Sequence, residues 1–509
     1  MTNPDDLTSW HSDWSGLRVT VLGLGVTGFS VADTLVELGA TVLVAAASAK
    51  AEQRQLLEVI GGRYLEHDLA SVPEEVTAFA PELVVVSPGF HPDNPVLVWA
   101  LNNGIPVWGD IELAWRVRDK VSPPAEWLLV TGTNGKTTTT QLATHILEQD
   151  GKRVAAVGNI GIPVLDAVRY PAGFDVLVVE LSSYQLHWLN HTPNGTITPW
   201  ASVCLNIADD HLDWHGSRAE YERAKGRVYT NTRTAAVYNR ADAATIRMVE
   251  NAEVIEGCRA IGFGLDTPGR SDFGVVDGIL LDRAFLDDRH STALEISTRE
   301  ELTAVGLGAP HSVANVLAAS ALVRSLDVDP AVLRAALLTF TLDAHRTEFV
   351  AEVGGVQWIN DSKATNPHAA AASLRAYNSV VWIVGGLFKG VDVGALVQAN
   401  TSRLSAAVLI GVDRLELKQA FARHAPELPV FEVDTTDTGD VMLAAVRLSA
   451  AAARPGDVVL LAPAAASFDQ FTSYGDRGTR FAAAVHTHAD QNHTEGDADG
   501  PSSSANPAT

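Results

Sequence analysis

A glycine-rich loop that could bind phosphate runs through Gly132, Thr133, Asn134, Gly135, Lys136, Thr137 and Thr138. It follows an apolar run typical of a strand and precedes a run typical of a helix. Backbone amides in such a loop can surround phosphate oxygens, a lysine can reach the terminal phosphates, and a threonine hydroxyl can ligate Mg²⁺. Val130 stands where the first glycine of G-x-x-x-x-G-K-[ST] belongs. The loop nevertheless predicts binding of a nucleoside triphosphate.

Acidic side chains follow two expected strands of the same region. Glu180 ends the apolar run 176–179, and an acidic cluster containing His211 follows the run 202–207. Ligands of α/β sheets collect beyond the carboxyl ends of the strands. Because carboxylates and phosphates are ligands that Mg²⁺ prefers, we expect Glu180 to bind metal. For His211 the residues alone leave a structural role equally open.

A second glycine loop lies near the start of the chain. Residues 23–28, which include Gly25, Val26 and Thr27, fit G-x-G-x-x-G between an expected strand and an expected helix. Such a turn favours a pyrophosphate at the helix N-terminus. The acidic residue that would bind a ribose hydroxyl is absent, since the next strand ends in Ala45-Ala46-Ala47. A diphosphate-bearing ligand is therefore expected rather than a redox cofactor, and a ligand-free turn is the alternative.

The elements that position these residues alternate between strands and helices. Expected strands at 17–23, 41–45 and 83–87 surround a helix at 26–38, which is the rhythm of a parallel sheet. The rhythm recurs in the middle and last thirds of the chain, and short strands and hairpins are expected over 231–310. Ser217 and Glu220 predict a capping box. We expect domains at 1–114, 115–343 and 344–485, followed by a disordered tail at 486–509.

Composition excludes several classes of protein. The 509 residues carry 37 Lys and Arg against 61 Asp and Glu, a net charge of −24, so a non-specific nucleic-acid binder is not expected. Two cysteines make a disulfide framework implausible. The polar N-terminus has no signal-peptide pattern, and no apolar run is long enough to cross a membrane. We expect a cytoplasmic protein, with the tail histidines solvated rather than binding metal.

Short motifs along nearly the whole chain resemble the Mur ligase family, and in particular its D-glutamate-adding branch. They are GLGVTG (23–28), SPG (87–89), GDIEL (109–113), TGTNGKTT (131–138), GNIG (158–161), ELSSYQL (180–186), DDHLDWH (209–215), ERAKGRVY (222–229), PHSVANVLAA (310–319), HR (345–346), NDSKATNP (360–367) and ASFDQF (466–471). The DNPR string of the diaminopimelate-adding branch is absent.

The resemblance implies an α/β fold of three domains, in which two Rossmann-like parallel-sheet domains flank a central P-loop ATPase domain. It implies ATP-dependent addition of D-glutamate to UDP-N-acetylmuramoyl-L-alanine through an acyl phosphate, by a monomer that inserts into no membrane. ATP would be contacted by Gly132, Thr133, Asn134, Gly135, Lys136, Thr137, Thr138, Asn315, Arg346 and Asp361. The substrates would be contacted by Gly25, Val26, Thr27, Ser87, Asn159, Lys363, Thr365, Lys389, Ser467 and Phe468.

The resemblance also implies the metal ligands. Thr137 and Glu180 would hold one Mg²⁺, and His211 with a carbamylated Lys225 would hold a second. With Lys136 these are the expected catalytic residues. An unmodified lysine, with a pKa of ~10.4, would repel the metal, and the residues alone favour Lys225 as an ordinary helix lysine.

Three other functions stay open. They are a sister ligase with another amino acid or a folate substrate, a nicotinamide-dependent oxidoreductase, and a non-catalytic nucleotide-binding module. Ala46, where the family usually has Asp, leaves the uracil contacts open. Two further departures from the family are Ser312 after His311 and Tyr474 where Phe is common.

Overall fold

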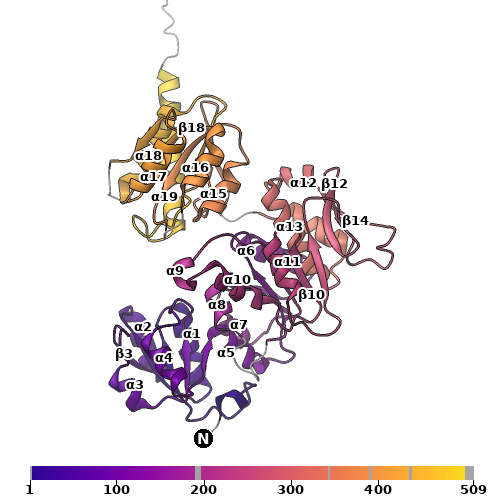
Figure 1. Cartoon of the computed structure of the whole chain (residues 1–509), viewed down its shortest axis with the longest axis vertical. Helices are drawn as coiled ribbons and strands as arrows, with labels where there is room; N and C mark the ends of the chain where they lie inside the picture. The colour runs from indigo at the N-terminus through magenta and orange to yellow at the C-terminus, as the bar shows by residue number, and fades with distance from the viewer. Residues whose placement is uncertain (1–2, 190–196, 342–343, 389–391, 435–437, 499–509) are drawn as a thin grey trace, which may run out of the picture. The chain divides into compact units, whose positions relative to one another are not determined.

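The computed structural model describes residues 3–189, 197–341, 344–388, 392–434 and 438–498 (Figure 1). Within these ranges the strands form three sheets of five, nine and six strands. The chain divides into two compact units, Met1–Ile207 with Trp214–Phe340 and Ala208–Asp213 with Thr341–Thr509. The first unit contains two of the sheets and the second contains one. The expected α/β fold with parallel-sheet domains is confirmed.

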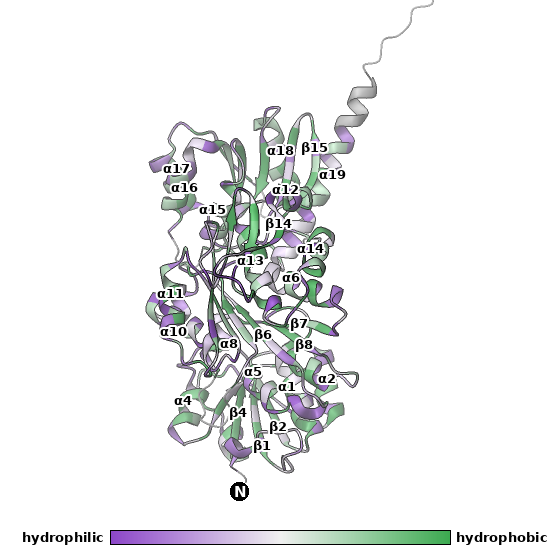
Figure 2. Ribbon diagram, turned by 90° about the vertical axis from the view of Figure 1, so that its right-hand side faces the viewer, coloured by the Kyte–Doolittle hydropathy of each residue, from purple (hydrophilic) through white to green (hydrophobic). Residues whose placement is uncertain are grey.

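The first sheet is parallel, in the order β3-β2-β1-β4-β5. Its elements are β1 (Arg18–Leu22), α1 (Val26–Glu37), β2 (Thr41–Ala46), α2 (Ala51–Ile60), β3 (Arg63–Glu66), α3 (Glu74–Phe79), β4 (Leu83–Val86), α4 (Pro95–Asn102), β5 (Val107–Gly109) and α5 (Asp110–Arg116). The expected strands are β1, β2 and β4, whose side chains are almost all buried. Figure 2 shows these strands as hydrophobic, and this is why the sequence reveals them.

The second sheet has the order β14-β13-β12-β11-β10-β9-β6-β8-β7. Its strands are β6 (Glu126–Thr131), β7 (Val154–Gly158), β8 (Val176–Glu180), β9 (Ala201–Cys204), β10 (Ala235–Asn239), β11 (Arg259–Phe263), β12 (Asp272–Val276), β13 (Ile279–Asp282) and β14 (Leu294–Thr298). Its helices are α6 (Lys136–Gln149), α7 (Val164–Arg169), α8 (Ser183–His187), α9 (Leu212–His215), α10 (Arg218–Gly226), α11 (Ala243–Glu250), α12 (Arg299–Ala304), α13 (Pro310–Arg324) and α14 (Pro330–Thr339). The expected hairpins are the antiparallel pairs β12–β13 and β13–β14.

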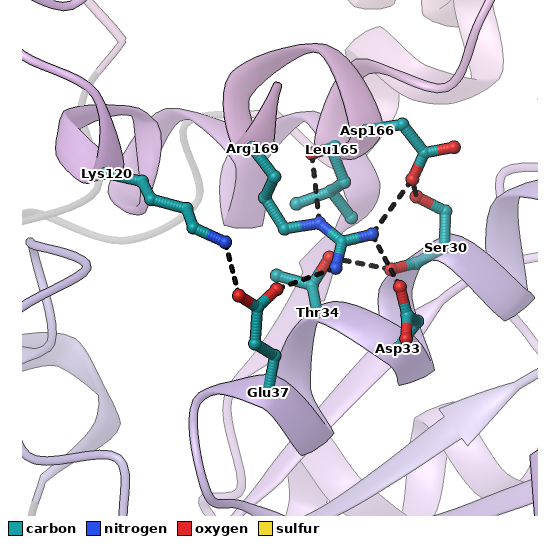
Figure 3. A network of polar contacts seen from close by, with 8 residues as sticks. All are labelled: Ser30, Asp33, Thr34, Glu37, Lys120, Leu165, Asp166 and Arg169. Atoms are coloured by element: carbon teal, nitrogen blue, oxygen red, sulfur yellow. Dashed lines mark hydrogen bonds and ion pairs between the residues drawn. The ribbon is translucent and has the colours of Figure 1, made fainter. Parts of the chain in front are cut away.

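Arg169, the last residue of α7, joins the first two sheets through helix α1 (Figure 3). Its guanidinium bonds Asp33 at 2.7 Å, Glu37 at 2.9 Å and Asp166 at 3.0 Å. Lys120 also pairs with Glu37. Burial opposes ionisation of Glu37, but hydrogen bonds from Lys120 and Arg169 outweigh it and lower its pKa. The helix after the first glycine loop is thereby tied to the domain that carries the phosphate loop.

A second tie joins two of the sequence motifs, GDIEL and ELSSYQL. Gln185 donates from Nε2 to Oδ2 of Asp110 at 3.2 Å, and Asp110 is only 4% exposed. Oδ1 of Asp110 is buried without a hydrogen-bond partner in the described part of the chain. Burial raises the pKa of Asp110 from 3.8 to about 6.

We expect Asp110→Asn to stabilise the protein at neutral pH. The folded-state pKa of Asp110 lies above its unfolded value, so folding binds protons, and the free energy of unfolding falls as pH rises from about 4 to 6. The amide removes this dependence, with an upper limit of roughly 3 kcal/mol above pH 6. Thermal melts at pH 4.5 and 7.5 test it. The melting temperature of the variant should exceed that of the parent protein only at the higher pH, whereas Asp68→Asn, at an exposed carboxylate, should give no such difference.

The third sheet has the order β15-β16-β20-β17-β18-β19, with only β15 antiparallel to its neighbour. Its elements are β15 (Glu348–Val353), β16 (Val356–Asn360), α15 (Pro367–Leu374), β17 (Val380–Gly385), α16 (Gly394–Asn400), β18 (Leu404–Ile410), α17 (Leu415–His424), β19 (Val430–Glu432), α18 (Thr438–Ala452), β20 (Val458–Leu461) and α19 (Tyr474–Ala498). One hydrophobic core lies against α15, α16 and α17, and another against α18 and α19. Helices therefore cover both faces of this sheet, as in a Rossmann-like domain.

Three local expectations need correction. A disordered tail is expected from residue 486, but helix α19 continues as far as Ala498. Within this stretch the ring of His488 packs 5.5 Å from the ring of Trp358. Strand β9 ends at Cys204, three residues before its expected end. The amide of Glu220 donates to Ser217 Oγ, but the Glu220 carboxylate bonds Arg223, so only half of the expected capping box forms.

None of the described helices has the length and apolar character needed to cross a membrane.

Candidate active site

The phosphate loop joins the end of β6 to the start of α6, as expected. Gly132 has φ +147° and Gly135 has φ +85°, backbone conformations that residues other than glycine rarely adopt. A Cβ on Gly132 would lie 2.9 Å from Leu205, and one on Gly135 would lie 2.3 Å from Oδ1 of Asn315. Both glycines are therefore required by close packing, and Asn315, an expected nucleotide contact on α13, lies against the loop.

Asn206 and Tyr221 hold the loop in place, and neither was singled out from the sequence. The amide of Asn134 donates to Asn206 Oδ1 at 2.9 Å, and Asn206 Nδ2 donates to the Asn134 carbonyl at 3.0 Å. The hydroxyls of Tyr221 and Thr133 are 2.9 Å apart in the interior. In the sequence, Asn206 is marked as a possible site residue only by being a polar residue just after the buried strand β9. No sequence pattern marks Tyr221.

Lys136 begins α6 and its side chain turns back over the loop. Its Nζ donates to the carbonyls of Gly132 and Thr133, both at 2.9 Å. Thr137 and Thr138 follow on the helix and are 8% and 6% exposed. The expected ATP-phosphate contacts thus occupy one loop at the N-terminus of a 14-residue helix, where the helix dipole favours negative charge.

Glu180 ends β8, next to β6 in the sheet, and is 1% exposed. Asn159 Nδ2 donates to Glu180 Oε1 at 2.9 Å, so the structure brings these two expected site residues together. Oε2 of Glu180 is buried and has no hydrogen-bond partner among the described residues. A buried carboxylate oxygen without a donor suits a hard cation such as Mg²⁺. The carboxylate of Glu180 therefore fits the Mg²⁺ that the sequence predicts.

Lys225 is not a solvated helix lysine, because it is 2% exposed. From α10 its Nζ donates to the carbonyl of Gly132 at 2.9 Å and to Oγ1 of Thr131 at 3.2 Å, and it lies 5.0 Å from the centre of the Tyr221 ring. Lys225 and Lys136 thus share the Gly132 carbonyl as an acceptor. The structure therefore places Lys225, one of the residues expected to bind metal, beside the phosphate loop.

A buried thiol lies close to these lysines. Burial raises the pKa of Cys204 to about 12, although the positive charges of Lys225 and Lys136 oppose that rise. The thiol therefore stays protonated and is a poor nucleophile or metal ligand.

His211 belongs to the second compact unit, with the rest of segment Ala208–Asp213. It has φ +52°, in the left-handed range that few residues other than glycine adopt. Its amide donates to Asp210 Oδ1 at 3.0 Å, and its Nε2 lies 3.6 Å from Asp210 Oδ2. Residues other than glycine that hold this conformation are found more often at functional sites.

The first glycine loop and the SPG motif also meet. A Cβ on Gly28 would lie 2.0 Å from the carbonyl of Gly23 and 3.3 Å from Ser87 Oγ. Gly25 is the N-cap of α1, and Val26, the next residue, is 70% exposed. Thr27 follows on the same turn. The expected substrate contacts of the first domain therefore converge on the N-terminus of α1.

Most of the expected amino-acid contacts lie in two loops of the second unit. Lys363 and Thr365 follow β16, and Ser467, which is 2% exposed, follows β20, the neighbouring strand. Phe468 is 70% exposed, and Lys389 lies outside the described residues. The ammonium of Lys363 lies 3.8 Å from the centre of the ring of Tyr474, the residue that departs from the family pattern.

The two expected nucleotide contacts of the second unit are neighbours. Asp361 is 8% exposed, and burial raises its pKa, although hydrogen bonds from Ser373 and the Thr347 amide and the charges of Arg346 and Arg477 act in the opposite direction. Arg346 is half-buried.

Comparison with known proteins covers nearly the whole chain. Family models match residues 17–109 (Mur ligase MurD-like, N-terminal domain), 130–323 (Mur ligase middle domain) and 345–465 (Mur ligase, glutamate ligase domain). A UDP-N-acetylmuramoylalanine–D-glutamate ligase of Leifsonia xyli is 65% identical over 94% of both chains. The protein of the same name from Streptomyces coelicolor is 51% identical over 93% of this chain and 98% of its own.

Solved structures agree on the fold. The UDP-N-acetylmuramate-alanine ligase of Thermotoga maritima matches 92% of this chain and 99% of its own with TM-score 0.53 and 18% identity. The MurF ligase of the same organism, in complex with ADP, matches 94% of this chain and 96% of its own with TM-score 0.53 and 17% identity.

Proposed function

Because the chain belongs to the Mur ligase family, we infer that it is the ATP-dependent ligase that joins D-glutamate to UDP-N-acetylmuramoyl-L-alanine in peptidoglycan synthesis. The relatives with 65% and 51% identity carry that activity in their names. The observation that carries the chemistry is the phosphate loop with Lys136, Lys225 and Glu180 gathered around the ends of two adjacent strands. An oxidoreductase explains none of these residues.

The reaction makes an amide from a carboxylate, which is unfavourable in water unless the carboxylate is activated. A carboxylate oxygen of L-alanine attacks the γ-phosphorus of ATP, the bond to the β-γ bridging oxygen breaks, and ADP leaves. The amine of D-glutamate then attacks the acyl phosphate, loses a proton and displaces inorganic phosphate. Positioning and charge neutralisation dominate such phosphoryl transfers.

In this proposal the loop residues provide both. The amides between Gly132 and Thr138 surround the phosphates, and Lys136 moves from the loop carbonyls to the terminal phosphates. Thr137 and Glu180 would hold Mg²⁺, which offsets the charge on the phosphates when bound. Asn315 lies against Gly135 and would contact the nucleotide from α13.

Lys225 is proposed to act as a carbamate. Its ammonium would lose one proton, and the resulting amine would add to CO₂ with loss of a second proton. This would replace a buried cation with an anionic oxygen, which together with His211 would hold a second Mg²⁺. Support comes from its burial and its place beside Gly132. A buried ammonium close to a second lysine and a metal would be electrostatically unfavourable.

The remaining proposals concern binding and location. The N-terminus of α1 with Ser87 would bind the UDP-sugar, together with Asn159. Arg346 and Asp361 would contact the nucleotide. We propose that the protein acts as a cytoplasmic monomer with domains at 1–114, 115–343 and 344–485.

Lys363→Ala and Ser467→Ala test the amino-acid pocket. A cation and a hydroxyl can each bind a carboxylate of D-glutamate, and charge-assisted hydrogen bonds contribute about 1.5–3 kcal/mol. We therefore expect the KM for D-glutamate to rise roughly 10–100-fold while the KM for ATP stays within about 2-fold. Steady-state kinetics with each substrate varied in turn measure both values. Unchanged D-glutamate kinetics in both variants would refute the pocket.

The activity itself is tested by phosphate release from ATP with Mg²⁺ and UDP-N-acetylmuramoyl-L-alanine. Release should depend on D-glutamate and not on L-glutamate, L-lysine or diaminopimelate. Release with a different amino acid would indicate a sister ligase. No release with any amino acid, in protein that binds ATP, would indicate a non-catalytic nucleotide-binding module.

A further inference from the structure

Arg477 is a fully buried arginine that no step of the proposed reaction uses. It lies in the first turn of α19 and is 0% exposed. A buried guanidinium needs partners for its donors, and the N-terminus of a helix is an unfavourable place for a cation. The groups that accept hydrogen bonds from Arg477 should therefore explain why a charged side chain is buried at the start of this helix.

The partners of Arg477 belong to both loops of the amino-acid pocket. Its Nε donates to Ser362 Oγ at 2.9 Å, and one Nη donates to the Ser362 carbonyl at 2.8 Å. The other Nη donates to the Ala465 carbonyl at 3.2 Å. Ser362 directly precedes Lys363, and Ala465 lies two residues before Ser467. The guanidinium of Arg477 thus connects the loop after β16 to the loop after β20.

Further contacts extend this tie to the start of α19. The hydroxyl of Ser362 donates to the carbonyl of Tyr474 at 2.7 Å, and the Tyr474 ring lies under the ammonium of Lys363. The Ala464 amide donates to the Ala364 carbonyl at 2.9 Å, so the two loops also meet directly. Arg477 and Ser362 form the centre of this arrangement.

The charge of Arg477 is itself unusual. Burial lowers its pKa to about 9, although the charges of Asp469 and Asp361 oppose that fall. The Asp361 carboxylate accepts its hydrogen bonds from Ser373 and the Thr347 amide, so its position does not depend on a bond to Arg477.

We propose that Arg477 is the positioning residue of the amino-acid pocket, and that it sets the spacing between Lys363 and Ser467 on which recognition of D-glutamate depends. This inference rests on the proposed function, because Lys363 and Ser467 are assigned to D-glutamate there. In this proposal Arg477 itself contacts none of the three substrates. It acts by holding the two loops, and a small displacement of either loop would separate the groups that bind the two carboxylates.

The test compares Arg477→Lys, Arg477→Met and Ser362→Ala with the parent enzyme. Arg480→Met is the matched control, since Arg480 lies on the same helix, is 42% exposed and pairs with Asp476. The KM for each of the three substrates, kcat and the melting temperature are measured on the full chain. We expect Arg477→Met to raise the KM for D-glutamate at least 10-fold with the other KM values within 2-fold.

Arg477→Lys should recover part of the loss, because an ammonium can reach only some of the three acceptors. Ser362→Ala should raise the KM for D-glutamate about 3- to 10-fold, since it removes one acceptor and keeps the buried cation. Arg480→Met should change none of the constants. If Arg477→Met does not fold, the KM values of Arg477→Lys and Ser362→Ala for D-glutamate test the proposal in its place.

Two results would overturn the proposal. One is an unchanged D-glutamate KM in the folded variants, and the other is an equal rise in all three KM values, which indicates a general structural role. If the parent enzyme released phosphate without needing D-glutamate, the proposed function would fail instead, so the two failures are distinguishable.

Discussion

Lys136→Met is expected to lower D-glutamate-dependent phosphate release about 10²–10³-fold, the effect of removing one donor to a charge that develops in the transition state. Lys136 is the cation of the phosphate loop, and methionine keeps much of its length without the charge. The main change should be in kcat, because in the proposal the glycine-loop amides and Asn315 still bind the nucleotide. Initial rates at saturating substrates measure the change.

The matched control is Lys152→Met, at a partly exposed lysine of the same domain that pairs with Asp150. It should keep the parent rate. Lys136→Met should also keep its melting temperature within a few degrees, because the bonds of Lys136 to Gly132 and Thr133 involve backbone carbonyls that water can satisfy. A fully active Lys136→Met enzyme would remove the phosphate loop from the mechanism.

Lys225→Ala is expected to lower activity at least about 100-fold, since even partners in the outer shell of a metal site contribute 10–100-fold. In the proposal the variant lacks the carbamate that holds the second Mg²⁺. Removal of the side chain leaves space beside Gly132, where we expect a small carboxylate to bind in place of the carbamate. Added formate, acetate or bicarbonate should therefore restore part of the activity, and the rescue should rise with anion concentration to a plateau.

Arg223→Ala is the control for Lys225→Ala, because it changes an exposed residue on the same helix, paired with Glu220. It should be active and indifferent to formate. Mass spectrometry under mild alkaline conditions should find CO₂ added to the parent protein and absent from the Lys225→Ala variant. Full activity of Lys225→Ala without any added carboxylate would rule out the carbamate.

Edge strands show where sequence patterns fail. The strands β3 and β5 of the first sheet, β7 of the second, and β15 and β19 of the third were all missed, and each lies at an edge of its sheet. An edge strand contacts one neighbour, and β3, β7, β15 and β19 are partly solvated, so their apolar patterns are weaker than those of central strands. Strand β5 is buried but is only three residues long. The central strands, buried on both faces, produce the continuous apolar runs that the sequence reveals.

The tail illustrates a related limit. Polar composition beyond residue 486 indicated disorder, yet α19 continues to Ala498. The N-terminal part of this helix packs on the third sheet through Phe481 and Val485, and helix extension costs little once a nucleus exists. Composition indicates whether a segment can fold by itself. Here the first part of α19 is stabilised by packing on the third sheet, and the polar residues extend a helix that already exists.

Sequence patterns alone predicted the alternation of central strands and helices, the two glycine loops, the phosphate lysine Lys136, and the family motifs that contain most of the expected site residues. These signals are local, because a tight turn, a helix N-terminus and an apolar period depend on residues close together in the chain.

Burial and contacts of the individual side chains became known from the three-dimensional structure. It placed Lys225 in the interior beside Gly132, left one oxygen of Glu180 without a donor among the described residues, and gave the phosphate loop its support from Asn206. It also placed Arg477 between two loops about a hundred residues apart in the chain. Burial and hydrogen-bond partners depend on residues that only folding brings together, so no local pattern can specify them.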